Sequence, residues 1–180
     1  MEAGATIVND VSAGLADPDM LDVVAELSGA HDLHLVLMHR RGGPADMQID
    51  PRYDDVLTEV VAHLDARAAA AEASGVPPGR IAVAPGIGFG KRLPHNLTLL
   101  AGLSTLRARG RPVVLGVSRK AFIAHLTGAE GPADRIGGTA AAVALAVASS
   151  SVDVVRVHDV SIMKQASMVA EAIAAAARDS

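Results

Sequence analysis

The side chains of this sequence that could do chemistry are grouped in five short motifs, each at the end of an apolar run. The motifs are Asn9–Asp10, Met38–His39, Pro85–Phe89, Gly116–Lys120 and Arg156–Asp159. Arginine suits phosphate because its guanidinium donates two parallel hydrogen bonds, and lysine supplies a point charge. The glycine-rich turn lets the backbone bend tightly and approach a ligand. Its likeness to a GxGxGK phosphate loop is weak, and we do not interpret it as a P-loop.

Five apolar runs rich in β-branched residues carry these motifs and are predicted to be strands. They cover residues 5–10, 33–39, 80–85, 111–118 and 152–160. Each is nearly continuous in apolar residues, which is typical of strands buried on both faces of a parallel sheet. Helical spacing predicts helices near 18–28, 52–74, 95–109, 119–127, 134–149 and 161–178, the second of them stopping at Gly75. The alternation indicates an α/β fold with parallel strands and right-handed crossovers.

All five motifs fall at the carboxyl ends of the predicted strands, where barrel enzymes and open α/β sheets place their sites. Strand ends also meet solvent, so any single polar residue could be there for that reason alone. Unusual residues at all five ends favour one functional site. Five strands cannot close a (β/α)8 barrel, which needs eight. We therefore expect a partial TIM barrel, with residues 1–180 forming a single domain.

The composition excludes several classes of protein and of site. The formal net charge of −4 indicates neither nucleic acid nor an anionic membrane as a partner. Cysteine is absent, which leaves no disulfide framework and no thiolate metal site. The longest apolar stretch, 139–148, is too short to span a bilayer, and MEAGATIVND lacks the pattern of a signal peptide, so we expect a cytoplasmic protein. No metal-ligand spacing is repeated by the remaining histidines, which we expect on the surface or in caps: His31, His34, His39, His63, His95 and His125.

Several segments together resemble dihydropteroate synthase. They are IVNDVSAG (7–14), LVLMHRRG (35–42), APGIGFGK (84–91) with HNLTLL (95–100), GVSRKAF (116–122) and VRVHDV (155–160). The resemblance implies a (β/α)8 barrel that condenses 6-hydroxymethyl-7,8-dihydropterin pyrophosphate with p-aminobenzoate, releases pyrophosphate and needs Mg²⁺. It matches strands four to eight, so we expect an N-terminally incomplete pterin-binding domain without the first three βα units and the loop that helps to hold Mg²⁺. It also implies a homodimer formed through late helices.

The resemblance implies a pterin pocket made by residues from several strand ends. In the family, the asparagine of the NDVS motif hydrogen-bonds the pterin ring, which corresponds to Asn9. Met38 is expected to pack on the flat ring, and Phe89 to lie between pterin and aminobenzoate. Gly116 lets the ring lie against its strand. Taken alone, Asn9 could be a strand-end cap and Met38 a core residue.

The resemblance also implies three catalytic residues, Lys120, Arg156 and His158. The ammonium of Lys120 is expected to contact the pterin and to border an aminobenzoate pocket lined by Phe89, Ser118, Arg119 and Lys120. The aminobenzoate carboxylate would meet the N-terminus of the helix that begins near Ala121. Arg156 and His158 are expected to face the pyrophosphate and stabilise the leaving charge as the methylene–oxygen bond breaks. This is electrostatic catalysis and not proton abstraction.

Ala84 departs from the family, which has an aspartate there in a DPGxGF motif. The pterin presents two adjacent donors, N3–H and the 2-amino group, and a carboxylate accepts both side by side. Such hydrogen bonds contribute roughly 1.5–3 kcal/mol each, so their loss weakens pterin recognition about a hundredfold or more. Asp10 is not an obvious substitute, because the family already has an aspartate there. The chain is then a decayed or regulatory relative, a deliberate knock-out of ligand binding, or a sequence with an error.

Two functions from different classes follow. The first is a dihydropteroate synthase of folate biosynthesis that is impaired by truncation and by Ala84. The second is a non-catalytic truncated relative, or a partner subunit that completes a barrel in trans. A methyltetrahydrofolate methyltransferase is disfavoured by SRK (118–120) and RVHDV (156–160). A five-strand piece has a bare inner face and two open edges, so residues 1–180 alone are expected to oligomerise or aggregate.

Overall fold

The computed structural model describes residues 4–178, and strands alternate with helices along them. The elements are β1 (Ile7–Asp10), α1 (Met20–Ala30), β2 (His34–Met38), α2 (Val56–Ala73), the 3₁₀ turn η1 (Pro78–Arg80), β3 (Ile81–Ala84), α3 (Leu93–Ala101), α4 (Leu103–Arg107), β4 (Val114–Leu115), α5 (Ala121–Thr127), the 3₁₀ turn η2 (Ala133–Arg135), α6 (Ile136–Ala148), β5 (Val154–Val155) and α7 (Val160–Arg178). Each of the five predicted strands contains one of these strands. The predicted α/β class is therefore confirmed.

The strands run parallel and neighbour one another in chain order. In the first sheet β2 lies between β1 and β3, with Asn9 opposite Val36 and Met38 opposite Ala84. The second sheet pairs β4 with β5, and a single parallel bridge between Val83 and Val113 joins the two sheets. All carboxyl ends consequently point the same way. The five strands form a curved wall, as in part of a barrel.

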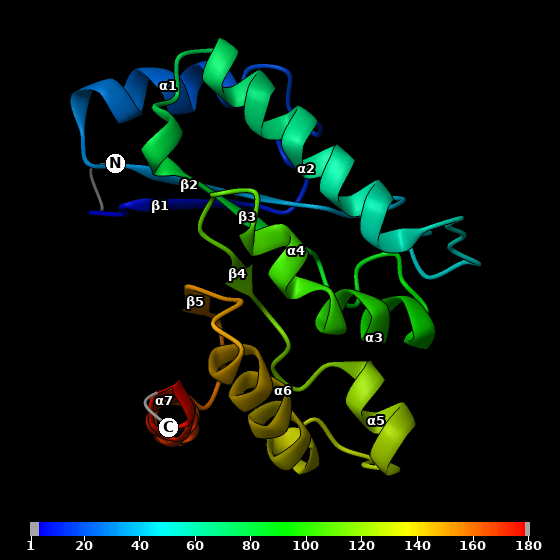
Figure 1. Cartoon of the computed structure of the whole chain (residues 1–180). Coiled ribbons are helices and arrows are strands. Elements are labelled where there is room, and N and C mark those ends of the chain that lie inside the picture. The colour runs from blue at the N-terminus through cyan, green and yellow to red at the C-terminus, as the bar shows by residue number, and fades with distance from the viewer. Residues whose placement is uncertain (1–3, 179–180) are drawn as a thin grey trace.

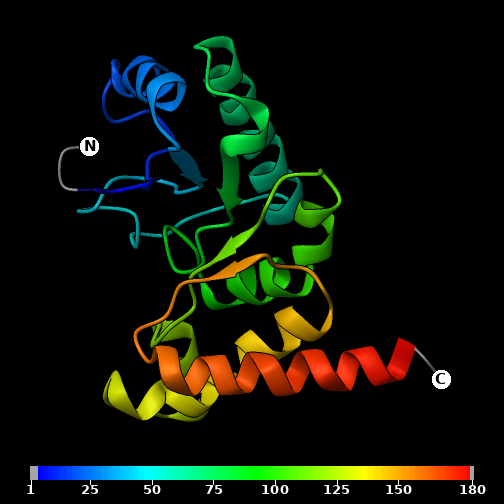
Figure 2. The ribbon, with the colours of Figure 1, turned by 90° about the vertical axis from the view of Figure 1, so that its left-hand side faces the viewer.

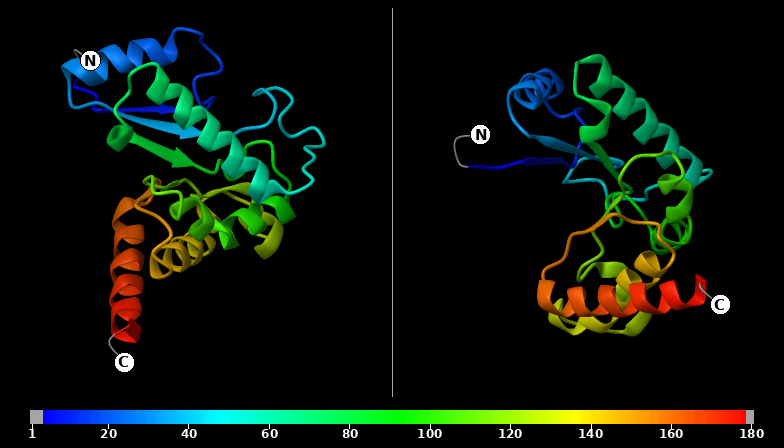
Figure 3. Two further views of the ribbon diagram at one scale, coloured as in Figure 1. Left: turned by 45° about the horizontal axis from the view of Figure 1, so that its top comes forward. Right: turned by 60° about the vertical axis from the view of Figure 1, so that its left-hand side comes forward.

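The helices lie on the outer side of this wall. In Figure 1 they follow an arc from α1 through α2, α3 and α5 to α7, with the strands inside the arc. The turned views show α2 alongside β3, and α7 packed along α6 at the other end of the molecule (Figures 2 and 3). No helix of the described residues is long and apolar enough to cross a membrane.

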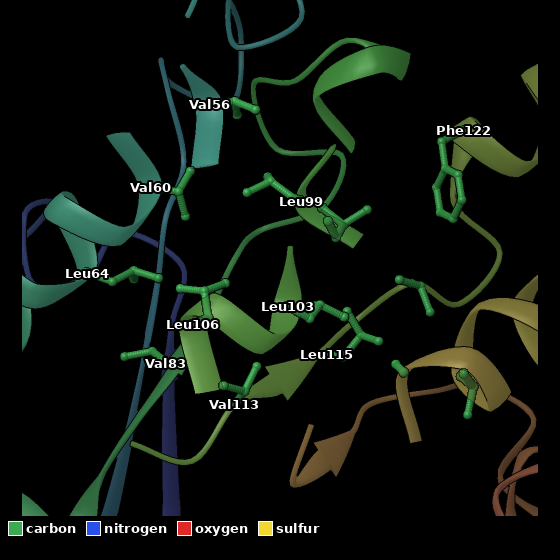
Figure 4. Close-up of a cluster of buried hydrophobic side chains, with 14 of the residues drawn as sticks. Val56, Val60, Leu64, Val83, Leu99, Leu103, Leu106, Val113, Leu115 and Phe122 are labelled. Atoms are coloured by element: carbon green, nitrogen blue, oxygen red, sulfur yellow. The ribbon is translucent and has the colours of Figure 1, made fainter. Parts of the chain in front are cut away.

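The main core lies between the wall and the helices that cover it from α2 to α7. Val60 and Leu64 of α2 face Leu99 and Leu106, and all four side chains are at most 2% exposed (Figure 4). Helix α2 is held at its start by the Asp55 carboxylate, which accepts from two amides of the first turn. It stops as predicted, because Gly75 adopts the left-handed φ of +106° just after the Ser74 cap.

The single helix predicted over 95–109 is wrong, because the structure has two helices that meet at Gly102. A Cβ on Gly102 would lie 2.7 Å from Cδ2 of Leu57 on α2. Leu57 therefore packs directly on the backbone where the helix is interrupted. The apolar period of leucines continues across the break, so periodicity alone did not show it.

The prediction that all strands are buried on both faces holds for β2 from Leu35 onward, for β3 and for β4, and is wrong for β1 and β5. Ile7 is 58% exposed and Val154 is 50% exposed. Their side chains border a hollow of about 450 Å³ on the inner side of the wall, together with Val36, Ile81 and Val114. The two edge strands, β1 and β5, are exposed because, within residues 4–178, no further strand or helix covers the inner face of the wall beside them.

Candidate functional site

The loop after β3 is held in its shape by three glycines with left-handed backbones. The φ angles of Gly86, Gly88 and Gly90 are +66°, +80° and +64°, a region that costs little only for glycine. A Cβ on Gly86 would overlap the carbonyl oxygen of His39, and one on Gly90 would overlap that of Arg41. Glycine is therefore needed here because this loop lies against the loop that follows β2.

Lys91 ends the glycine loop and is buried, with 4% of its surface exposed. Its ammonium lies 3.0 Å from the carbonyl oxygens of Gly86 and Phe89 and 2.9 Å from Nδ1 of His39. These contacts occupy the donors that a P-loop lysine would direct to phosphate. The weakness of the GxGxGK likeness noted in the sequence is consistent with this arrangement.

The expectation that His39 is a surface or capping histidine is wrong. The residue is 4% exposed, and its ring lies 4.8 Å from the ring of His63 in an edge-on contact. Burial, then the nearby Lys91, lowers the pKa of His39 to about 3. His39 is therefore a neutral residue inside the joint between two loops. The capping role is confirmed for His95, whose Nδ1 accepts from the amide of Arg92 at the start of α3.

Lys120 lies between two hollows at the carboxyl ends of the strands. Its Nζ donates to the carbonyl of Ile87 and lies 4.5 Å from the centre of the Phe89 ring, a cation–π contact. Burial, and then the charge of Arg156, lower the pKa of Lys120 to about 8. One hollow, of about 460 Å³, lies beside Phe89, and the other, of about 270 Å³, lies beside Arg156.

The smaller hollow contains the basic residues of the last strand end. It is lined by Gly116, Ser118, Lys120, Arg156, Val157 and His158. The Ser118 hydroxyl lies 2.8 Å from Nδ1 of His158. The same hydroxyl accepts a hydrogen bond from the backbone amide of His158 at 3.1 Å. If this hydroxyl donates to Nδ1, then Nε2 of His158 carries the proton and is a free donor. The guanidinium of Arg156 lies over Gly116, where an added Cβ would be 3.4 Å from it, an ordinary van der Waals contact.

Arg119 points away from both hollows. Its guanidinium binds the Asp159 carboxylate through two hydrogen bonds, of 2.6 and 3.0 Å. This pairing raises the pKa of Arg119 and lowers that of Asp159. The Arg119 amide donates to Thr139 Oγ1, and its φ is +59°. The expected contact of Arg119 with aminobenzoate stays a prediction, while the structure shows the residue joining the loops after β4 and β5.

Residues expected to hold a flat ring lie on the inner side of the wall. Met38 and Ala84, opposite each other in neighbouring strands, are 3% and 8% exposed, and Phe89 packs against their cluster. Asn9 and Arg156 border the inner hollow. The Asp10 carboxylate accepts from Ser12 and from the amide of Gly14. Asp10 is thus occupied by its own turn, in agreement with its exclusion as a substitute for the missing aspartate.

The structure brings most of the predicted residues together, and it adds two that the sequence reasoning missed. Lys91 was noticed only as part of a weak phosphate motif; its signal was a lysine directly after three spaced glycines. Gln48 donates to the carbonyl of Gly88 at 2.7 Å and lines the larger hollow. It lies in the non-repetitive segment between β2 and α2, where no periodic signal could have singled it out. Ser118 borders the smaller hollow and not the larger one beside Phe89.

Comparisons with known proteins agree on one family. Residues 1–158 match the family of pterin binding enzymes. The chain is 46% identical over 158 residues to the dihydropteroate synthase of Neisseria meningitidis serogroup C, covering 87% of this chain and 54% of that protein. It is 39% identical over 173 residues to that of Synechocystis, covering 96% and 58%. The chain thus spans somewhat more than half the length of these relatives.

Solved structures give the same result. The dihydropteroate synthase of Yersinia pestis, in a complex with a sulfonamide drug, superposes with a TM-score of 0.89 at 34% identity, covering 96% of this chain and 60% of that one. That of Xanthomonas albilineans in complex with 7,8-dihydropteroate has a TM-score of 0.84 at 42% identity, with 96% and 60% covered. That of Thermus thermophilus in complex with 6HMPPP has a TM-score of 0.86 at 43% identity, with 95% and 65% covered.

Proposed function

Because this chain belongs to the pterin binding enzyme family, we propose that it supplies the substrate-binding strand ends of a dihydropteroate synthase. The reaction joins 6-hydroxymethyl-7,8-dihydropterin pyrophosphate to p-aminobenzoate and gives 7,8-dihydropteroate and pyrophosphate. The observation that carries the proposal is the position of Lys120 between two hollows, one beside Phe89 and one beside Arg156 and His158. Two substrates that react at one methylene carbon need two adjoining pockets of this kind.

The pterin is proposed to lie on the inner side of the wall. Met38 offers an apolar surface for the ring, Asn9 a hydrogen-bonding side chain and Gly116 an approach without a side chain. Lys120 borders the ring on its other side. Ala84 stands where an aspartate would accept the two pyrimidinone donors, and its surroundings are apolar. We therefore propose that this chain holds a pterin less tightly than its relatives do.

Pyrophosphate departure is proposed to depend on Arg156 and His158. The guanidinium can donate two parallel hydrogen bonds to phosphate oxygens, and Nε2 of His158 can donate one when Ser118 holds Nδ1. These donors stabilise charge that develops on the bridging oxygen as the methylene–oxygen bond breaks. The amine of p-aminobenzoate attacks the same carbon. No residue of the chain is required as a base in bond cleavage.

The aminobenzoate is proposed to occupy the larger hollow, with Phe89 and Lys120 at its inner end. Helix α5 begins at Ala121 beside this hollow. Ser118 and Arg119 are proposed to contribute from the same loop, Ser118 through His158 and Arg119 through Asp159. These two contacts hold the loop that carries Lys120, and we propose that Ser118 and Arg119 influence aminobenzoate binding by holding this loop in place.

The five strands are proposed to be strands four to eight of a (β/α)8 barrel, in a cytoplasmic protein that forms homodimers when the barrel is complete. Mg²⁺ is a proposed partner of the pyrophosphate. The described residues do not fit it as a protein-bound ion, because residues 4–178 contain no cluster of three histidines and acids that could hold a metal. Asp159, beside His158, is already paired with Arg119.

A second candidate function is a non-catalytic relative or partner subunit. The apolar Ala84 and the open inner hollow favour it, since both weaken the pterin site while leaving the loops intact.

Complementation of a dihydropteroate synthase deletion strain tests the choice between the two. The chain is expressed alone, together with a separate fragment that supplies the first three βα units, and together with that fragment as the Ala84→Asp variant. Growth with the unaltered chain, alone or with the fragment, that is lost again with Lys120→Met supports the enzyme, whereas growth only with Ala84→Asp shows that the unaltered chain is non-catalytic. Absence of growth in all arms supports the non-catalytic function.

A further inference from the structure

Lys91 has an unusual environment for a cation. It is 4% exposed, and among the described residues no carboxylate forms an ion pair with it. Its Nζ instead faces the carbonyl oxygens of Gly86 and Phe89 at 3.0 Å each and that of His39 at 3.4 Å. The fourth neighbour is Nδ1 of His39 at 2.9 Å. Every one of these groups can act as an acceptor.

The ammonium form suits this set of acceptors. It has three N–H donors, whereas a neutral amine has two and would leave a carbonyl without a donor. His39 can accept because its pKa, lowered by burial to about 3, keeps the ring unprotonated. Burial, followed by the charges of Lys120 and Arg41, lowers the pKa of Lys91 to about 7. Near pH 7 the ammonium and the neutral amine are therefore both populated, and the hydrogen bonds to carbonyl oxygens favour the ammonium, which predominates at lower pH.

The contacts of Lys91 join two loops that carry the candidate site. His39 belongs to the loop after β2, while Gly86 and Phe89 belong to the loop after β3. That second loop also presents the carbonyl of Ile87 to Nζ of Lys120. With three glycines at positive φ it has much conformational freedom to lose. A central donor that binds several of its carbonyls restricts it to one arrangement.

We propose that Lys91 is a positioning residue whose ammonium fixes the loop 85–91 against the loop after β2 and thereby sets the places of Phe89 and Lys120. The importance of these places for ligands rests on the proposed function. The ordering of the loop does not, and it can be measured without any ligand.

The experiment uses the absence of cysteine from the sequence. A Lys91→Cys variant is alkylated in denaturant and refolded. Aminoethylation rebuilds a lysine with sulfur in place of one methylene, whereas propylation gives a side chain of the same length without charge. Lys164→Cys, on the exposed surface of α7, receives both treatments as the matched control. Hydrogen exchange of residues 85–91 is followed by mass spectrometry, which works whatever the oligomeric state.

The propylated Lys91→Cys chain is expected to exchange in residues 85–91 about tenfold faster or more than the unmodified chain, because two or three hydrogen bonds to a charged group are lost. Aminoethylation is expected to restore slow exchange, and exchange in α2 should stay unchanged. Equal exchange of the aminoethylated and propylated chains would overturn the proposal, because packing alone would then order the loop. The Lys164→Cys derivatives should not differ in this loop.

A measurement on the unmodified chain covers the case in which neither derivative refolds. The sequence contains three lysines, Lys91, Lys120 and Lys164. Under brief acetylation, the rate of Lys91 relative to Lys164 is expected to be at least about a hundredfold lower in the folded chain than in denaturant, since enclosure by acceptors outweighs the larger fraction of neutral amine that its lowered pKa gives. Similar relative rates in the two states would overturn the proposal. Titration with p-aminobenzoate separates the role of Lys91 from the proposed function. If the order of the loop depends on the ammonium but the chain binds no p-aminobenzoate, the proposed function is refuted and the role of Lys91 is not.

Discussion

The two sides of the strand wall differ sharply in how well the chain covers them. On the outer side, four inward-facing side chains of α2, α3 and α4 are at most 2% exposed; they are Val60, Leu64, Leu99 and Leu106. On the inner side, Ile7 and Val154 are 58% and 50% exposed beside a hollow of about 450 Å³. Both sides are apolar in sequence. The difference shows that residues 4–178 contain the helices that complete the outer core but no element that completes the inner one.

The largest expected effect concerns the inner side as a whole. Several hundred Å² of exposed apolar surface costs on the order of 10 kcal/mol, comparable to the stability of an entire domain. The free edges of β1 and β5 add a route to association. We expect residues 1–180 alone to oligomerise or aggregate in light scattering and to unfold without a sharp thermal transition. A monodisperse monomer with one cooperative transition would contradict this, and would remove the contrast between the two sides.

Single substitutions on the two sides should separate them further. Leu99→Ala on the outer side is expected to lower the free energy of opening of β3, as hydrogen exchange measures it, by about 2–5 kcal/mol, because it opens a cavity in a closed core. Ile7→Ala on the inner side should change it by less than about 0.5 kcal/mol, because that side chain is already largely in water. Hydrogen exchange of β3 can report both values. Equal losses would show that the inner side is covered in solution.

The pH dependence of stability should show the lowered pKa of His39, which lies where the loops after β2 and β3 meet. Its pKa is about 3 in the folded chain and 6.5 in the unfolded one, so the unfolded state binds more protons between these values. Stability is therefore present above about pH 6.5 and falls as pH drops towards 3, by roughly 1.4 kcal/mol per unit of pKa difference and a few kcal/mol in total. Replacing His39 by Gln should flatten this slope, whereas His125→Gln, at an exposed position, should not.

Ala84→Asp should act on ligand binding at the inner side. The restored carboxylate is expected to raise affinity for 6-hydroxymethyl-7,8-dihydropterin pyrophosphate about a hundredfold, measured by calorimetry. Because Ala84 is buried among apolar side chains, the same change should lower stability in the absence of ligand. Ala82→Asp, on the same face of β3 and further from the strand end, is the control and should give no gain. Absence of any gain with Ala84→Asp would mean that the uncovered inner side, and not Ala84, limits pterin binding.

The smallest expected effect concerns an exposed residue at the end of the wall. Arg156→Ala is expected to weaken binding of sulfate, a mimic of pyrophosphate, by about tenfold in calorimetry because a pair of hydrogen bonds is lost. Stability should hardly change, since Arg156 is exposed. Unchanged sulfate affinity would contradict the assignment of the smaller hollow to pyrophosphate. Arg178→Ala, at the end of α7, is the charge-matched control.

Sequence patterns predicted the fold more completely than the site. The apolar runs located every strand, and the glycine after α2 located its end. The strand-end motifs correctly grouped Lys120 with Arg156 and His158 around one hollow. The sequence did not predict that Arg119 would hold Asp159, a residue 40 positions away, or that Ser118 would bind His158. Neighbours in a motif can point to opposite sides of a loop, and sequence order does not record which way each one points.

The sequence by itself determined the order of strands and helices, because the period of apolar residues follows directly from helix and strand geometry. It also determined that the reactive side chains gather at one end, because parallel strands place all their carboxyl ends together. Only the tertiary structure decided which apolar faces are buried, since burial depends on what lies opposite. It likewise decided that His39 is neutral and that Lys91 is enclosed by carbonyls. Both depend on two loops, some 50 residues apart in the chain, that contact each other only in the fold.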